Sequence, residues 1–218
     1  MKNIDTILFD IDGTLLDTEI YTISSKIIEG KKYGYNVKEC DVIRALGMSK
    51  EASKKHYTSL YGENFPVKEL SSKRIEYIYN ALYNNEIKYK DGAKELIEYL
   101  VANNYKIALV SSSTKELIDE YKKRLDLFKY FDVIISVNDT KLGKPHPDPY
   151  LKGAEILNSL PQNCLVIEDS KNGILSAKNA NMKSVFIEDL VKVDAEIRAN
   201  STYILNNLKE IITLLNND

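Results

Sequence analysis

The sequence predicts an α/β fold in which a doubly wound parallel sheet carries a small inserted α-helical domain. Short apolar runs with strand character recur along the chain, and helix-like periodicity follows each of them. This alternation is interrupted once, between residues 17 and 89, where only helical periodicity is found. The two observations together favour one sheet with a helical insertion after its first strand.

The expected strands cover residues 6–9, 106–110, 133–137, 164–167 and 184–187, with a weaker strand at 203–205 and a last helix that ends near Leu215. On each side of the second strand, apolar residues recur at the spacing of one helix face. We therefore assign residues 1–16 and 90–218 to the sheet core and residues 17–89 to the insert.

Apolar residues at helical spacing also organise the insert. One expected stripe consists of Ile20, Ile23, Ile27 and Ile28, and a second consists of Ile75, Ile78 and Leu82. We expect the two ends of the insert to lie close together on the sheet, where they can act as a pair of hinges.

Composition excludes several classes of function. The 218 residues include 30 Lys plus Arg and 32 Asp plus Glu, which leaves no basic field for nucleic acid. No run approaches the roughly 18 consecutive apolar residues of a membrane span. The cysteines, Cys40 and Cys164, lack a metal-ligand spacing and indicate free thiols in a reducing compartment. We expect a cytoplasmic protein with no membrane, nucleic-acid or obligate protein partner.

Polar residues follow three of the expected strands where each strand ends. They are Asp10, Asp12, Gly13 and Thr14 after the first, Ser111, Ser112 and Ser113 after the second, and Glu168 and Asp169 after the fourth. Ligands of an open α/β sheet bind at this edge. Four carboxylates gathered there would repel one another unless a cation lay among them. Oxygen ligands without His or Cys favour Mg²⁺.

A metal site beside hydroxyl groups and a lysine is typical of a phosphate site. Ser111 and backbone N–H groups at a helix start would hold phosphate oxygens, and Lys144 would neutralise charge. The sequence contains no Walker loop, so a covalent aspartyl phosphate is the catalytic option that remains. Asp10 and Asp12 lie two residues apart and point the same way, so one can be the nucleophile and the other can carry the proton.

The segments Asp10-Ile11-Asp12-Gly13-Thr14, Ser111, Lys144 and Glu168-Asp169 resemble, in order and spacing, the motifs of the haloacid dehalogenase (HAD) superfamily. The insert resembles the helical cap of its β-phosphoglucomutase and phosphoglycolate phosphatase branch. The resemblance covers essentially the whole chain and implies a Rossmann-like core. Asn181 departs from relatives that commonly have Gly there, but Asn also tolerates a left-handed helix end.

The resemblance implies a role for each motif residue. Asp10 would be the nucleophile and Asp12 the general acid and then base, while Ser111, with Ser112 beside it, and Lys144 would bind phosphate. Mg²⁺ would be held by Asp10, the backbone carbonyl of Asp12, and Asp169, with Glu168 nearby. In the cap, we expect substrate contacts from Tyr21, Thr22, Gly47, Ser49 and Lys50.

These roles predict a Mg²⁺-dependent hydrolase of phosphate monoesters that acts on a small phosphorylated metabolite. The alternative is a β-phosphoglucomutase-type phosphosugar mutase, whose cap carries a His and an Arg where this chain has Thr22 and Lys50. A phosphonatase, with Lys50 as its imine-forming lysine, and a non-catalytic phosphoacceptor module are remoter alternatives. Asp12 opposes both, because it supplies the acid that ester turnover needs.

Overall fold

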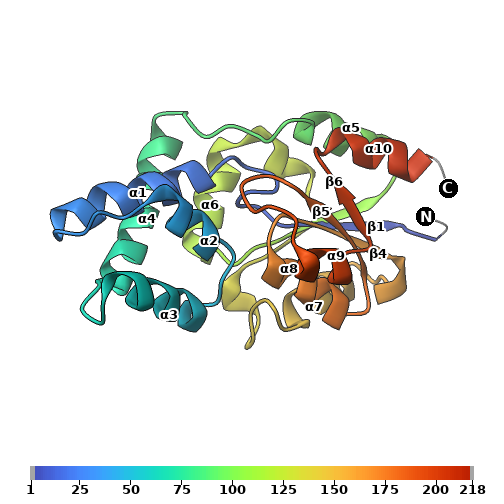
Figure 1. Cartoon of the computed structure of the whole chain (residues 1–218). Helices are drawn as coiled ribbons and strands as arrows, with labels where there is room; N and C mark the ends of the chain where they lie inside the picture. The colour runs from blue at the N-terminus through green and yellow to red at the C-terminus, as the bar shows by residue number, and fades with distance from the viewer. Residues whose placement is uncertain (1–2, 217–218) are drawn as a thin grey trace. The chain divides into compact units, whose positions relative to one another are not determined.

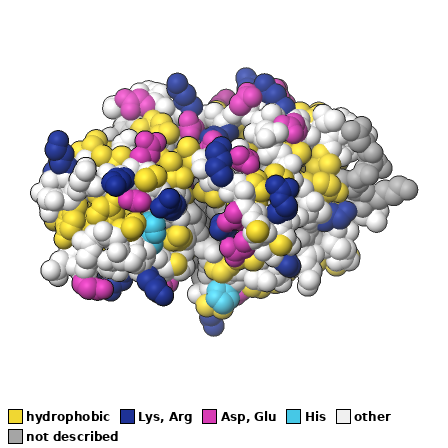
Figure 2. Space-filling view, viewed as in Figure 1, with side chains coloured by type: hydrophobic (Ala, Val, Ile, Leu, Met, Phe, Trp, Pro, Cys, Tyr) yellow, Lys and Arg dark blue, Asp and Glu magenta, His cyan; other side chains and the backbone are white. Residues whose placement is uncertain are grey.

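A computed structural model of the chain describes residues 3–216. The chain divides into two compact units, one of residues 1–16 with 89–218 and one of residues 17–88. We call them the core unit and the cap unit. In the described residues, no helix has the length and hydropathy needed to cross a membrane. On the face drawn in Figure 2, basic and acidic side chains are interspersed, as the nearly balanced charge leads one to expect.

The core unit is built on a parallel sheet of six strands in the order β3-β2-β1-β4-β5-β6. Strands β1, β4, β5 and β6 are labelled in Figure 1. The strands are β1 (Thr6–Phe9), β2 (Lys106–Val110), β3 (Val133–Ile135), β4 (Cys164–Glu168), β5 (Lys183–Ile187) and β6 (Tyr203–Leu205). The strand order reverses direction at β1, which lies between β2 and β4. In such sheets ligands bind beyond the carboxyl ends at this reversal, so the residues after β1, β2 and β4 are placed for function.

The predicted α/β fold with a parallel sheet and a helical insert is confirmed. The third strand ends at Ile135, two residues before its predicted end. The Ser136 side chain accepts a hydrogen bond from the Asn138 N–H and begins a short 3₁₀ helix, η2 (Val137–Asp139). A local side-chain cap therefore competes successfully with the strand at this point.

Helices α5 (Ala93–Ala102) and α10 (Lys209–Asn216) lie together on one side of the sheet, and α7 (Asp148–Ile156), α8 (Lys171–Asn179) and α9 (Ala195–Asn200) lie on the other (Figure 1). The remaining core helices are α6 (Lys115–Arg124), η1 (Asp126–Tyr130) and η3 (Pro161–Asn163). Leu8, Val110 and Val166 pack with Tyr150 of α7 on one face of the sheet. Successive strand residues face opposite ways, and Phe9 accordingly packs edge-on against Phe131.

Asparagine ends four of the helices in a left-handed conformation. Asn85, Asn104, Asn158 and Asn181 have φ angles between 51° and 59°. Asn adopts this conformation more readily than other non-glycine residues because its short polar side chain bonds locally. The expectation that Asn181 tolerates a left-handed helix end is confirmed.

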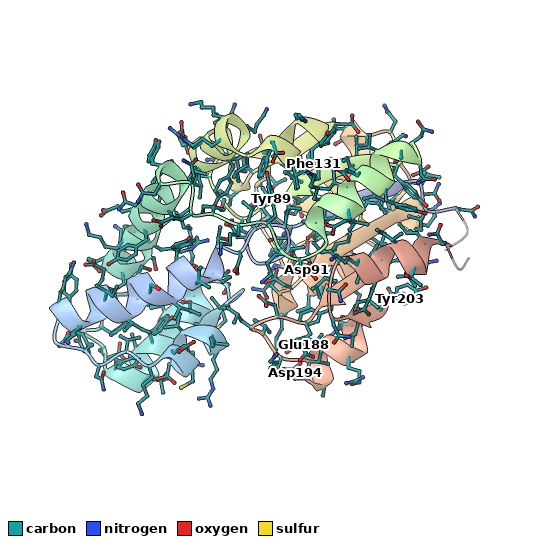
Figure 3. All side chains as sticks on the ribbon, turned by 90° about the horizontal axis from the view of Figure 1, so that it is seen from above. Tyr89, Asp91, Phe131, Glu188, Asp194 and Tyr203 are labelled. Carbon is teal, nitrogen blue, oxygen red and sulfur yellow. The ribbon has the colours of Figure 1, made fainter. Side chains whose placement is uncertain are left out.

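The two segments that join the units run side by side. The Asp17 N–H donates to the Lys88 carbonyl at 2.9 Å, and the Lys90 N–H donates to the Leu15 carbonyl at 2.9 Å. Tyr89, labelled in Figure 3, lies on the returning segment. Its hydroxyl donates to Asp126 at 2.9 Å and accepts from the Leu127 N–H at 3.1 Å. The returning segment is therefore tied to the core unit by side-chain as well as backbone bonds.

The cap unit consists of α1 (Glu19–Lys32), α2 (Glu39–Ala45), α3 (Lys50–Tyr61) and α4 (Val67–Tyr83). On α1, Ile23 is buried but Ile20 and Ile28 are 43% and 47% exposed, so the predicted apolar stripe is wrong for these two residues. The buried face of α1 instead includes Thr22, Ser25, Lys26, Glu29 and Gly30.

Partners on α4 explain why polar residues of α1 are buried. The Lys26 ammonium donates to the Ser71 hydroxyl at 3.0 Å, and the Arg74 guanidinium donates to the Thr22 hydroxyl at 2.9 Å. Hydrogen bonds of this kind offset the cost of removing polar groups from water. The α1–α4 interface is therefore polar at its centre, which a hydrophobic pattern cannot predict.

Lys26 is a source of instability in the cap unit. Burial, and secondarily the nearby charge of Arg74, lower the pKa of Lys26 to about 8. The difference from the ordinary value of 10.5 corresponds to about 3 kcal/mol of lost stability while the lysine is charged. The full penalty applies below about pH 8, where Lys26 is charged in both the folded and the unfolded chain. Between about pH 8 and 10.5 the folded chain loses this proton while the unfolded chain keeps it, so the penalty decreases and then disappears.

We predict that Lys26→Met raises the free energy of unfolding near pH 7, by up to about 3 kcal/mol, because it removes the buried charge. Urea unfolding at pH 7 and at pH 9.5 measures the effect, and the advantage of the variant should shrink at the higher pH. Lys31→Met, on the exposed face of the same helix, is the control. An advantage that does not change with pH would contradict this explanation.

Candidate active site

Lys144 joins two carboxylates that come from different strands. It lies in the loop between η2 and α7, and its side chain is 5% exposed. The ammonium donates to Asp10 Oδ1 at 2.5 Å, to Glu168 Oε1 at 2.6 Å and to the Val110 carbonyl at 2.8 Å. An ammonium has three N–H donors, so each of them is used and the position of Lys144 is fixed.

Glu168 ends β4 and is fully buried. Besides Lys144, its Oε1 accepts from the Tyr150 hydroxyl at 2.7 Å, and its Oε2 accepts from the backbone N–H and the hydroxyl of Ser170 at 3.1 and 2.9 Å. A Cβ at position 173 would collide with the Glu168 carboxylate, which requires Gly173 at the start of α8. These contacts satisfy a buried charge whose isolation would be costly.

Asp169 follows directly and is held by the loop after β1. The Thr14 hydroxyl donates to Asp169 Oδ1 at 2.7 Å. Gly13 has a φ of +93°, and a Cβ there would collide with the Asp169 carboxylate. Glycine is therefore required at position 13 by both backbone conformation and space.

Asp10, Glu168 and Asp169 each offer a carboxylate oxygen within 4.8 Å of the others, and all three residues are buried. The Lys144 ammonium bonds to Asp10 and Glu168, so one positive charge faces three carboxyl groups. A set of charged oxygen donors with excess negative charge suits a hard divalent cation. The group could therefore hold a metal ion, and it contains three of the four residues predicted as metal ligands.

The pKa values of Asp10 and Lys144 are both shifted in this group. Burial is the largest cause that raises the pKa of Asp10, to about 8; Lys144 opposes this rise and the Glu168 charge adds to it. Burial by itself would lower the pKa of Lys144, but the carboxylates of Asp10 and Glu168 hold that pKa above its ordinary value. A divalent cation in the group would favour the ionised form of Asp10.

Asp12, the fourth predicted ligand, directs its carboxylate to other partners. Its Oδ2 accepts from the Ser113 hydroxyl at 2.6 Å, and its Oδ1 accepts from the Tyr121 hydroxyl at 3.0 Å. Ser111 is buried and its hydroxyl accepts from the Ser113 N–H at 3.0 Å, whereas Ser112 is exposed. The assignment of Ser111, Ser112 and Lys144 to phosphate, and of the Asp12 carbonyl to the metal, stays a prediction.

The sequence pattern does not predict the supporting roles of Ser113, Tyr121 and Tyr150. In the sequence, Ser113 is part of a serine run, and Tyr121 shares the helical spacing of Leu117 and Ile118. A buried tyrosine normally finds a hydrogen-bond partner for its hydroxyl. Tyrosine within an otherwise aliphatic helix face is therefore the signal by which Tyr121 could have been recognised.

The residues predicted as substrate contacts of the cap all lie in the cap unit. The Tyr21 hydroxyl donates to the Glu86 carbonyl at 3.2 Å, and Thr22 accepts from Arg74. Gly47 has a φ of 68°. Ser49 caps α3 through the Ala52 N–H. Lys50 is the exposed first residue of that helix. Their contact with substrate stays a prediction.

Comparison with known proteins identifies the class of this enzyme. Residues 7–187 match the family model of haloacid dehalogenase-like hydrolases, and the chain belongs to this family. It is 30% identical to the phosphorylated carbohydrates phosphatase of Thermotoga maritima, over 95% of this chain and 100% of that protein. It is 28% identical to pyrophosphatase PpaX of Bacillus mycoides, over 97% of each chain.

The fold is shared with solved structures. The β-phosphoglucomutase of Clostridium difficile has a TM-score of 0.76 to this chain at 24% identity, with 98% of this chain and 96% of that chain covered. At this identity the likeness concerns the fold. Together with the family match, it confirms the predicted membership in the haloacid dehalogenase superfamily and the predicted enzyme class, a phosphatase of that family.

We predict that Asp10→Asn stabilises the metal-free protein. Because the folded-state pKa of Asp10 is raised to about 8, the fold favours the neutral form, and wild-type stability falls as the pH rises from about 4 to 8. Asn is neutral throughout this range. Melting temperatures measured in EDTA at pH 5 and pH 8 should show the variant gaining on the wild type at the higher pH.

Asp119→Asn, which changes an exposed carboxylate on α6, is the control and should follow the wild type. Saturating Mg²⁺ should raise the melting temperature of the wild type more than that of Asp10→Asn. A metal-free Asp10→Asn protein that loses stability with pH as steeply as the wild type would refute the raised pKa.

Proposed function

We propose that the chain is a Mg²⁺-dependent phosphate monoester hydrolase that acts on a small phosphorylated metabolite through an aspartyl phosphate on Asp10. The observation that carries this proposal is the buried group of Asp10, Glu168 and Asp169 with Lys144 bonded to two of them. Such a group at the carboxyl edge of a parallel sheet combines a nucleophilic carboxylate, a metal site and a fixed cation.

The residues fit a resident magnesium ion by the chemistry of their donors. Asp10 and Asp169 would hold the ion with the backbone carbonyl of Asp12, and Glu168 would lie beside it. When bound, Mg²⁺ neutralises negative charge on the phosphoryl group and favours ionised Asp10. Lys144 and the Ser111 hydroxyl would bind the remaining phosphoryl oxygens.

In the first step an Asp10 carboxylate oxygen attacks phosphorus, and the bond from phosphorus to the ester oxygen breaks. The electron pair of that bond goes to the leaving oxygen, which takes a proton from the Asp12 carboxyl group. In the second step water attacks the phosphorus and gives a proton to Asp12. The bond from phosphorus to Asp10 then breaks, and its electron pair restores the Asp10 carboxylate.

The named relatives suggest which substrates to test first. The Thermotoga protein is named for phosphorylated carbohydrates, and PpaX for pyrophosphate. We propose small phosphorylated sugars or glycolate-like esters as the substrate class, in keeping with a catalytic site that specifies the phosphoryl group. A panel of phosphorylated metabolites, with pyrophosphate included, measures this by release of phosphate.

We predict that removal of metal abolishes activity. With excess EDTA, phosphate release should fall to the level of the buffer, and added Mg²⁺ should restore it, because the carboxylates then regain their counter-charge. Recovery on addition of Mg²⁺ excludes irreversible denaturation by EDTA as the cause of the loss. Full activity in EDTA would remove the metal from the proposal.

We predict that substitutions of the two aspartates reduce activity in different ways. Asp10→Asn should be inactive and should take up no label from ³²P-substrate, since an amide is not a competent nucleophile. Asp12→Ala should be slowed by about 10²- to 10⁴-fold, the usual contribution of general acid–base catalysis. Rapid quench followed by peptide mass spectrometry locates the phosphate, and a phosphorylated residue other than Asp10 is the contrary result.

The residue at position 22 supports a phosphate hydrolase rather than a phosphosugar mutase. It lies where the mutases carry a histidine, and its hydroxyl accepts a hydrogen bond from Arg74. A threonine hydroxyl cannot replace imidazole in proton handling near neutral pH. Incubation with β-glucose 1-phosphate, primed with the glucose bisphosphate, should therefore release phosphate and form little glucose 6-phosphate. Isomerisation a hundredfold faster than phosphate release would establish the mutase instead.

A further inference from the structure

Tyr121 combines complete burial with a hydrogen bond to a catalytic candidate. It lies on α6 in the core unit and is 0% exposed, and its ring packs against Phe128 with 5.8 Å between the ring centroids. Its hydroxyl donates to Asp12 Oδ1 at 3.0 Å. Aliphatic residues, Leu117 and Ile118, form the rest of the buried face of α6, so the hydroxyl is the polar group that this face presents.

Ser113 holds the other oxygen of the same carboxyl group. Its hydroxyl donates to Asp12 Oδ2 at 2.6 Å, and its own N–H donates to the Ser111 hydroxyl at 3.0 Å. Ser113 is 6% exposed. Asp12 itself is only partly buried. Two buried donors therefore reach the carboxyl group of a residue that is itself only partly buried.

Two donors on two oxygens fix a carboxyl group against rotation. Each carboxylate oxygen has two lone-pair positions, so each can accept one of these hydrogen bonds and still exchange a proton at the other position. Proton transfer in a transition state depends on such orientation, because the donor must lie within hydrogen-bond reach of the leaving oxygen.

We propose that Tyr121, together with Ser113, is a positioning residue that aims the Asp12 carboxyl group at the leaving oxygen of the substrate. This inference rests on the proposed function, in which Asp12 gives its proton to that oxygen as the bond to phosphorus breaks. It specifies the substrate class further: Tyr121 matters for esters whose leaving alkoxide needs a proton, and it is dispensable where the leaving group is stable as an anion.

The experiment compares two substrates in Tyr121→Phe, which keeps the buried ring and removes the hydroxyl. One substrate is an alkyl phosphate found active in the metabolite panel, and the other is 2,4-dinitrophenyl phosphate, whose phenolate leaves without a proton. The parameter is kcat/KM, which covers the steps up to formation of the phosphoenzyme. We expect a loss of about tenfold or more for the alkyl ester, within the range of general acid catalysis, and an unchanged value for the dinitrophenyl ester.

Tyr99→Phe is the matched control, because its hydroxyl donates to Asn216 between α5 and α10 in the same unit. This variant should leave kcat/KM unchanged for both substrates. Ser113→Ala should show the same selective loss as Tyr121→Phe, since it frees the other carboxyl oxygen. The melting temperature of each variant is measured alongside.

Each outcome decides the inference. An equal loss for both substrates assigns Tyr121 to the integrity of the site and overturns its role in aiming Asp12. An unchanged alkyl ester rate, or a faster one, overturns it as well. If the wild-type protein hydrolyses neither the panel nor the dinitrophenyl ester, the proposed function itself fails, and this result is distinguishable from failure of the Tyr121 role.

Discussion

The site depends on an imbalance of charge at the carboxyl edge of the sheet. Three buried carboxylates lie within reach of one another, and Lys144 brings a single positive charge to two of them. In a medium less polar than water, repulsion between carboxylates a few ångströms apart amounts to several kcal/mol. Burial and the Glu168 charge accordingly raise the pKa of Asp10. A cation held by this group would offset the repulsion.

Parallel topology creates the imbalance. Asp10 directly follows β1 and Glu168 ends the neighbouring strand β4, so their side chains meet at the same edge although 158 positions separate them in sequence. The surrounding residues then adapt to the carboxylates: Gly13 and Gly173 leave room for Asp169 and Glu168, and Tyr150 bonds to Glu168 from α7. Helices α7 and α8 thus serve the site as well as the core.

Much of this organisation could be predicted from sequence, because the information is local. The β-rich runs predict strands, and the rule that ligands bind beyond the carboxyl ends brings together Asp10, Glu168 and Asp169 without any structure. The contacts that could not be predicted are those made by single polar atoms between distant segments. Tyr121 looks like an apolar helix residue until its hydroxyl is placed beside Asp12.

The buried face of α1 shows the same limit of pattern analysis. Hydrophobic periodicity selected Ile20 and Ile28, which are exposed. The buried positions belong instead to polar residues such as Lys26, which finds Ser71 on α4. A hydrophobic pattern ranks residues by their own side chains, whereas burial of a polar residue depends on a partner 45 positions away.

A divalent cation bound by Asp10, Glu168 and Asp169 should displace a proton from this group, because the pKa of Asp10 is raised. Isothermal titration calorimetry measures the binding of Mg²⁺ to the metal-free protein near pH 7. Repeating the titration in buffers of different ionisation enthalpy gives the number of protons released on binding. Since the pKa of Asp10 is raised to about 8, we predict release of about one proton per ion bound and none in Asp10→Asn. Binding of Mg²⁺ without proton release, or no binding at all, would contradict it.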